Sequence, residues 1–168
     1  KIVMPETTPH VKVSATRGYG ADVVLEGETV AEAQLAAERI AAAENRVFIH
    51  PYDDYDVIAG QGTIALEMLA DVPDLDAIVV PVGGGGLVSG MATAARALKP
   101  DIRIIGVETR MYPSMWAAMN NVRASAGGAT LAEGIAVKNV GEKTLAIARD
   151  LVDEIILVDE SHLERAVN

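Results

Sequence analysis

The chain has 168 residues, of which 50% are hydrophobic and 4% aromatic, and its formal net charge is −10 at pH 7. Half-hydrophobic composition at this length is enough to bury the core of one medium-sized domain. The acidic balance without a basic run argues against nucleic acid as a partner, the lack of cysteine excludes disulfides, and no apolar run approaches the ~20 residues of a membrane span.

Short apolar runs and helical patterns alternate over the first third of the chain. The expected elements there are strands at 1–4, 21–25 and 47–49 and a helix at 9–20. A second helix begins at Thr29, because Thr29 and Glu32 have the spacing of a capping box. We expect it to run to about Glu44 with one apolar face, formed by Val30, Ala33, Ala37, Ile40 and Ala41.

The alternation continues after a polar loop at 50–56, which is the best candidate for a domain boundary. The expected elements are helices at 60–69, 87–98, 112–120, 144–151 and from 161 onward, strands at 77–82, 102–107 and 154–158, and irregular chain at 124–136. Continuous apolar strands separated by helices are typical of parallel sheets covered on both faces. The sequence therefore predicts an α/β fold with three layers, in which ligands lie beyond the carboxyl ends of the strands.

The most informative segment is a run of four glycines that joins an apolar strand directly to a helix. It consists of Gly83, Gly84, Gly85 and Gly86, and Leu87 follows. Glycines let backbone N–H groups converge on one point, and the helix N-terminus adds a positive dipole. The run therefore predicts a cradle for a phosphate group.

Three interpretations of this run stay open at the level of the residues. The first is a structural turn between strand and helix. The second is a dinucleotide site, because Gly84, Gly86 and Ser89 approach the Gly-x-Gly-x-x-Gly pattern and Glu108 ends the next strand, although the third glycine is missing. The third is a site for the phosphate of pyridoxal 5'-phosphate.

Residues 80–87, with the sequence VPVGGGGL, resemble the phosphate loop of the fold-type-II pyridoxal-phosphate enzymes, and more narrowly of the threonine dehydratase and serine racemase branch. Other segments are similar to that branch in the same order along the chain: 2–9, 15–21, 48–54, 58–63, 105–108 and 132–138. The resemblance therefore covers the chain from its first residues to its last third.

The resemblance implies an incomplete tryptophan-synthase-beta-like fold. Residues 1–55 would be the later part of the small, mobile domain, and residues 56–168 a truncated large domain that binds the cofactor. Pyridoxal 5'-phosphate would be held by backbone amides of Gly83, Gly84, Gly85, Gly86 and Leu87, with Gly134 in a loop near its ring.

The lysine that forms a Schiff base with the cofactor in this family lies in a Ser-Phe-Lys-x-Arg-Gly type of motif, which this chain lacks. Its five lysines stand in other contexts: Lys1, Lys12, Lys99, Lys138 and Lys143. The resemblance thus implies that no catalytic residue is present, that the Schiff-base lysine lies outside this chain, and that the chain is a middle piece of the enzyme.

The parent enzyme would be an L-threonine or L-serine dehydratase, an ammonia-lyase of amino-acid metabolism such as isoleucine biosynthesis. Its substrate would be a small amino acid, its products a 2-oxo acid and ammonia. We expect a cytoplasmic homo-oligomer without nucleic-acid or membrane partners, and inactivity of this chain alone. The alternatives are a serine racemase-like enzyme and a non-catalytic remnant that associates with itself.

Glu108 is a candidate ligand for a divalent cation, because racemase-like members of the family use an acid at this position. The second acid of that site is replaced around Ser114, so the alternative is a strand-end acid that pairs with Arg110 or with a helix N-terminus. A metal cluster of His50 with the nearby aspartates is less favoured than a hinge loop.

Overall fold

The computed structural model describes residues 1–168 and divides into two compact units, Lys1–Ile49 and His50–Asn168. We describe each unit by itself. The division falls a few residues before the predicted boundary at 55/56. The reason is that Tyr52 and Asp53 form hydrogen bonds to residues 139–144, which belong to the second unit.

The first unit is a small parallel sheet with two helices. Its elements are β1 (Ile2–Met4), α1 (His10–Gly18), β2 (Val23–Leu25) and α2 (Val30–Ala43). Strands β1 and β2 pair in parallel, with Val3 opposite Val24. All four elements were expected from the apolar pattern of the sequence.

The predicted capping box at the start of α2 is confirmed. The Thr29 hydroxyl accepts a hydrogen bond from Glu32 N–H at 3.3 Å, and the Glu32 carboxylate accepts one from Thr29 N–H at 3.2 Å. The predicted apolar face is right at Ala33, which is buried, but wrong at Val30, which is 70% exposed. Val30 is the first helical residue and lies in the open N-terminal turn.

The predicted third strand at residues 47–49 is wrong. The structure has no strand there, and Val47 and Ile49 are 88% and 68% exposed. A strand needs a neighbour for its ladder of hydrogen bonds, and β1 and β2 pair only with each other. Apolar β-branched residues alone therefore did not make a strand in this unit.

The second unit contains the remaining helices and strands of the chain. Its elements are α3 (Tyr55–Asp71), β3 (Ala77–Pro81), α4 (Gly86–Leu98), β4 (Arg103–Thr109), α5 (Ser114–Met119), the 3-10 turn η1 (Glu133–Ile135), α6 (Glu142–Leu151), β5 (Glu154–Val158) and α7 (Glu160–Val167). The strands pair in parallel in the order β3-β4-β5, which confirms the predicted sheet. Helix α3 begins five residues before its predicted start, because Asp54 accepts hydrogen bonds from Asp56 N–H and Val57 N–H.

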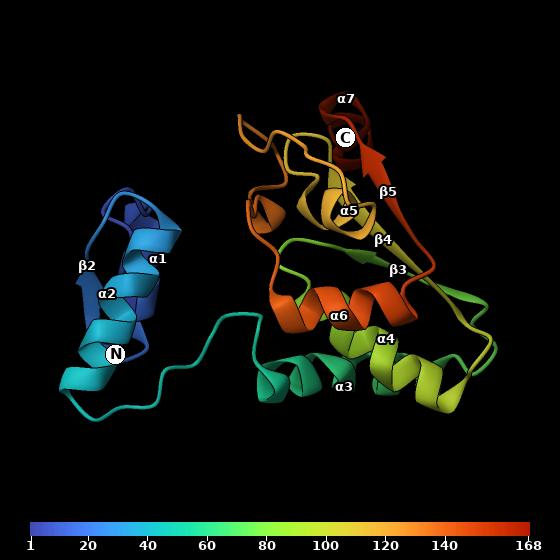
Figure 1. Ribbon diagram of the computed structural model, residues 1–168, viewed down its shortest axis with the longest axis horizontal. Helices are drawn as coiled ribbons and strands as arrows, with labels where there is room; N and C mark the ends of the chain where they lie inside the picture. Colours follow the sequence, from blue (N-terminus) through green and yellow to red (C-terminus); the bar gives the residue numbers. More distant parts are fainter. The chain divides into compact units, whose positions relative to one another are not determined.

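Helices α4, α3 and α6 lie together along one side of this sheet (Figure 1). The strand side chains that face them form the core and include Ile78, Val80 and Ile104, each at most 1% exposed. Val79 and Ile156 point to the opposite face and are 63% and 43% exposed. The second helical layer predicted for the sheet therefore does not cover these two residues.

Helices α3 and α4 approach each other closely at Gly90. A Cβ atom on Gly90 would lie 2.1 Å from the carbonyl oxygen of Ile58, a distance that real side chains do not reach. The small residue thus sets the separation of the two helices. None of the helices is both long and apolar enough to cross a lipid bilayer.

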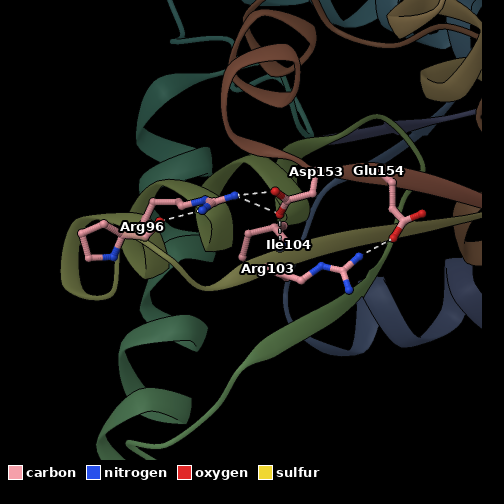
Figure 2. A network of polar contacts seen from close by, with 6 residues as sticks. Arg96, Arg103, Ile104, Asp153 and Glu154 are labelled. Atoms are coloured by element: carbon pink, nitrogen blue, oxygen red, sulfur yellow. Dashed lines mark hydrogen bonds and ion pairs between the residues drawn. The ribbon is translucent and has the colours of Figure 1, made fainter.

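Charged side chains tie α4 to the amino-terminal ends of β4 and β5 (Figure 2). Arg96 donates to both Asp153 carboxylate oxygens at 2.8 and 2.9 Å, and Ile104 N–H donates to one of them at 2.6 Å. Arg103 and Glu154 form a separate, exposed pair at 2.7 Å. This end of the sheet is held by polar contacts, whereas the opposite end carries the glycine run.

Candidate functional site

The glycine run forms the turn between the carboxyl end of β3 and the first residue of α4. Gly85 is the N-cap of α4 and has φ = +96°, the left-handed region that favours glycine. It provides no side chain to bind the first N–H groups of the helix. The predicted position of the loop, beyond a strand end and at a helix N-terminus, is what the structure shows.

The backbone N–H groups of Gly83, Gly84, Gly85, Gly86 and Leu87 donate no hydrogen bond to any group of this chain. Three of these residues, Gly84 to Gly86, are buried. Buried backbone donors are nearly always paired, and the positive end of the α4 dipole lies at the same place. The loop therefore has the geometry and the donor chemistry for a phosphate group, and it fits the phosphate of pyridoxal 5'-phosphate.

The glycines also pack tightly against other parts of the unit. A Cβ on Gly84 would lie 2.4 Å from Cγ of the Tyr52 ring, and one on Gly85 would lie 2.4 Å from Met115 Cε and 2.8 Å from Thr144 Cβ. The Thr144 hydroxyl donates to the Gly84 carbonyl oxygen at 2.7 Å. The lack of side chains in the loop thus permits close packing against neighbouring residues and also leaves its N–H groups accessible.

Asp53 is a residue whose role the sequence did not indicate. Its carboxylate accepts hydrogen bonds from Glu142, Lys143 and Thr144 N–H at 3.1, 2.9 and 3.1 Å. These are the first residues of α6, whose N-cap Gly141 has no side chain to bind them. Glycine has no side chain that could accept from the first helical N–H groups, so at the start of α6 these donors depend on another group or on water.

The segment with Gly134 lies beside the glycine loop. A Cβ on Gly83 would be 3.2 Å from Ile135 Cα, the residue next to Gly134. Glu160 supports the start of this segment, since its carboxylate accepts from Leu131 N–H at 3.0 Å and from the Thr109 hydroxyl at 2.8 Å. The same two bonds hold the pKa of Glu160 below its usual value. The structure thus brings the two predicted cofactor segments together.

Glu108 is 1% exposed and caps helix α5. Its two carboxylate oxygens accept from Met115 N–H and Trp116 N–H, each at 2.8 Å. Burial raises its pKa to about 7, although these backbone bonds act in the opposite direction. This matches the helix N-terminus alternative. No group of three or more His, Asp or Glu side chains in the chain is arranged to hold a metal ion.

His50 shapes the turn before Asp53. Its Nδ1 atom accepts from Tyr52 N–H at 3.3 Å and from Asp53 N–H at 2.8 Å, and its ring lies edge-on to the Tyr52 ring with centroids 4.6 Å apart. These contacts agree with a structural turn. Of the three aspartates near His50 that could have formed a metal cluster with it, Asp53, Asp54 and Asp56, the first two accept hydrogen bonds from backbone N–H groups.

Three of the five lysines donate to other groups. Lys143 Nζ bonds to the Asp53 carbonyl oxygen at 3.1 Å, Lys99 Nζ to the Leu75 carbonyl oxygen at 2.7 Å, and Lys1 pairs with Glu44. Lys138 lines a cavity of about 480 Å³ beside α5 that includes none of the loop glycines. The cavity is therefore separate from the candidate phosphate site.

Comparisons with known proteins show the family of this chain. The family described as pyridoxal-phosphate dependent enzymes matches residues 1–168. The chain is 49% identical to an L-threonine ammonia-lyase of Geobacter sulfurreducens over 168 residues, which are 99% of this chain and 42% of that protein.

The solved structures that this chain resembles include a threonine deaminase and a serine racemase. The processed form of threonine deaminase isoform 2 from Solanum lycopersicum matches 94% of this chain and 44% of its own, with a TM-score of 0.85 and 42% identity. Maize serine racemase matches 99% of this chain and 52% of its own, with a TM-score of 0.90 and 33% identity. The chain thus spans about half the length of these relatives. It belongs to the pyridoxal-phosphate dependent enzymes, in the threonine dehydratase and serine racemase branch.

Proposed function

We propose that Gly83, Gly84, Gly85, Gly86 and Leu87 bind the phosphate of pyridoxal 5'-phosphate, and that the chain is the phosphate-binding part of an L-threonine ammonia-lyase. The observation that carries the proposal is the row of backbone N–H groups that have no acceptor in the chain. Its position at the N-terminus of α4 supports the binding of an anion there.

In this proposal the chain contributes binding and orientation. The loop amides hold the phosphate, and the α4 dipole adds attraction to its negative charge. The segment around Gly134, which packs on Gly83 through Ile135, lies beside the ring of the cofactor. When bound, the cofactor supplies an electron sink for charge that develops at the α-carbon of the substrate. The parent protein would release ammonia and a 2-oxo acid.

L-threonine is the favoured substrate because the relatives of this chain include L-threonine ammonia-lyases of Geobacter sulfurreducens and Thermotoga maritima, which are 49% and 46% identical to it. The reaction would serve isoleucine synthesis or threonine breakdown. A serine racemase is the second candidate, favoured by the TM-score of 0.90 to the maize enzyme. In the full-length parent we expect a 2-oxo acid from L-threonine, whereas D-serine formed from L-serine without a 2-oxo acid would favour the racemase.

The first experiment compares pyridoxal 5'-phosphate with pyridoxal, which lacks the phosphate, by calorimetric titration of the 168-residue chain. We expect saturable binding of the phosphorylated form and on the order of tenfold or weaker binding of pyridoxal, because several charge-assisted hydrogen bonds are lost. Equal affinity for the two compounds would contradict the proposal.

A second experiment tests whether the chain acts alone. We expect no 2-oxo acid from L-threonine with the cofactor present, since the Schiff-base lysine is proposed to lie outside this chain. Steady production that survives purification would overturn that part of the proposal. Light scattering of the same sample tests the expected homo-oligomer and separates it from a monomer.

A further inference from the structure

The turn at residues 50–54, called the linker turn below, is joined to the glycine loop by two routes. The first route is the Tyr52 side chain. Its ring lies where a Cβ on Gly84 would be, with Cγ 2.4 Å from that position. Its backbone lies against Gly86 at a longer distance, with the Tyr52 carbonyl oxygen 3.1 Å from the Cβ position of Gly86. Its hydroxyl donates to the Asn139 carbonyl oxygen at 2.9 Å. The ring is thus held at both ends against the loop.

The second route passes through helix α6. Asp53 binds the first three N–H groups of α6, among them that of Thr144. The Thr144 hydroxyl then donates to the carbonyl oxygens of Gly84 and Gly141, at 2.7 and 3.2 Å. Thr144 is fully buried. A displacement of Asp53 would therefore reach the Gly84 peptide group through one side chain.

The direction of the Gly84 carbonyl matters for the loop because a peptide group is planar. When the Gly84 carbonyl oxygen is fixed on Thr144, the N–H of Gly85 in the same peptide plane points the other way. That N–H is one of the donors left without an acceptor in the chain. The hydrogen bond to the Gly84 carbonyl thus also fixes the direction of the Gly85 N–H.

We propose that Tyr52 and Asp53 are positioning residues for the phosphate of the cofactor: they hold the Gly84–Gly85 peptide in the orientation that presents the loop N–H groups to the anion. This inference rests on the proposed function, since it assigns residues to the same site. It adds a consequence, because coupling between two events is reciprocal. Phosphate binding at the loop stabilises the linker turn by the same factor by which the turn favours binding.

The test uses Asp53→Ala and, as a milder change, Asp53→Asn, in the 168-residue chain. Asp159→Ala is the matched control, because Asp159 also caps a helix by accepting from a backbone N–H, that of His162 at 3.0 Å, but has no contact with the loop. Each protein is titrated with pyridoxal 5'-phosphate and with pyridoxal. Amide chemical shifts of the loop glycines are recorded without ligand, and hydrogen exchange at 50–54 is recorded with and without cofactor.

We expect Asp53→Ala to weaken binding of pyridoxal 5'-phosphate on the order of tenfold and to leave pyridoxal binding within twofold, because only the phosphate contacts depend on the loop. The amide shifts of Gly84 and Gly85 should move in Asp53→Ala and stay in place in Asp159→Ala. Cofactor should slow exchange at Tyr52 in the wild type and not in the variant. A purely structural role of Asp53 would weaken both ligands equally.

The outcomes separate the two proposals. If the wild type binds no pyridoxal 5'-phosphate, the proposed function fails, and the ligand-free shifts of Gly84 and Gly85 still decide whether the linker turn positions the loop. If the wild type binds the cofactor and both Asp53 variants match it in affinity and in shifts, the inference is wrong and the proposed function stands. Should Asp53→Ala fail to fold, Asp53→Asn and Tyr52→Phe are read in the same way, the latter through loss of the bond to Asn139.

Discussion

The Thr144 hydroxyl and the Gly84 carbonyl oxygen are joined by a hydrogen bond of 2.7 Å, across 60 residues of chain. Both residues are buried, and the Gly84 carbonyl has one further donor, Gly141 N–H, at 3.4 Å. The bond connects the start of α6 with the loop at the start of α4. It is the shortest polar link between the loop and the rest of its unit.

Replacing Thr144 separates packing from hydrogen bonding. Thr144→Val keeps the shape but leaves the Gly84 carbonyl with its long bond only, so we expect a loss of about 1 to 3 kcal/mol in unfolding free energy and weaker binding of pyridoxal 5'-phosphate. Thr144→Ser keeps the hydroxyl and loses a methyl group, so it should cost about 1 kcal/mol and retain the affinity. Urea unfolding and cofactor titration measure the two effects, and equal affinities in both variants would contradict the role of the bond.

The carboxyl group of Glu108 makes stability depend on pH in an unusual direction. Its pKa in the folded chain is raised to about 7 from an ordinary value of 4.5, so the folded state holds the proton more strongly than the unfolded state. The stability it contributes is complete below about pH 4.5 and is lost as the pH rises through about 7. Most carboxylates with a hydrogen-bonded partner behave in the opposite way.

Glu108→Gln isolates the pH dependence, because its side chain does not titrate. Its single amide oxygen can keep only one of the two hydrogen bonds from the α5 backbone, and this loss is the same at every pH. We expect the unfolding free energy of the wild type, relative to the variant, to fall between about pH 4.5 and pH 7. Taking the difference of the two proteins at each pH cancels the groups they share. A difference that is flat across this range would show that Glu108 is not protonated in the folded chain.

Of the two ion pairs in Figure 2, one shares further hydrogen bonds and the other is exposed. We therefore expect different losses of unfolding free energy when each pair is broken. Burial disfavours the charge of Asp153, but hydrogen bonds from Ile104 N–H and Arg96 and the charge of Arg103 outweigh it and lower its pKa. Arg96→Gln should destabilise the chain by about 1 to 2 kcal/mol. Arg103→Gln removes an exposed pair with Glu154 and should cost between about 0 and 1 kcal/mol.

Thermal unfolding of the two variants in low and high salt measures this contrast. The cost of Arg103→Gln should shrink with added salt, because exposed charges are screened, whereas the cost of Arg96→Gln should persist. Costs that are equal and equally sensitive to salt would mean that the bonds to Asp153 have no special part in joining α4 to β5.

Two glycine substitutions should have opposite signs. Gly85→Ala forces a Cβ into a left-handed conformation with φ = +96° and into contact with Met115 and Thr144, so it should destabilise the chain by about 2 to 4 kcal/mol. Gly60→Ala lies within α3, where a Cβ meets nothing within 4 Å, and should stabilise it by about 0.5 to 1 kcal/mol. A urea midpoint for Gly85→Ala at or above the wild-type value would contradict the observed loop geometry.

Local patterns in the sequence predicted most of the elements and part of the site. The capping box at Thr29, the glycine run and the parallel strands each depend on residues that are close in the chain. Glu108 was foreseen as either a metal ligand or a cap, and the structure shows the cap. The start of α3 was missed because Asp54 stands in a polar stretch that looks like a loop until its N-cap bonds are seen.

Contacts between distant residues could not be predicted. Asp53 and Thr144 are separated by 91 residues, and the sequence around either residue gives no sign that the two are in contact. Val47 and Ile49 show the reverse case, since their β-propensity was clear but a strand also depends on a partner elsewhere. Periodicity therefore placed the elements, while the support of the loop came from long-range pairs.

The separation between Asp53 and α6 also bears on the order in which the chain folds. A ribosome delivers Asp53 long before Glu142, Lys143 and Thr144, and closing a loop of this length costs entropy before any bond is gained. The helices and strands of the sheet can form from contacts nearer in the chain. The proposed phosphate cradle would then be among the last parts of the unit to take its shape, and under the proposed function a nascent chain would bind the cofactor only after α6 had emerged.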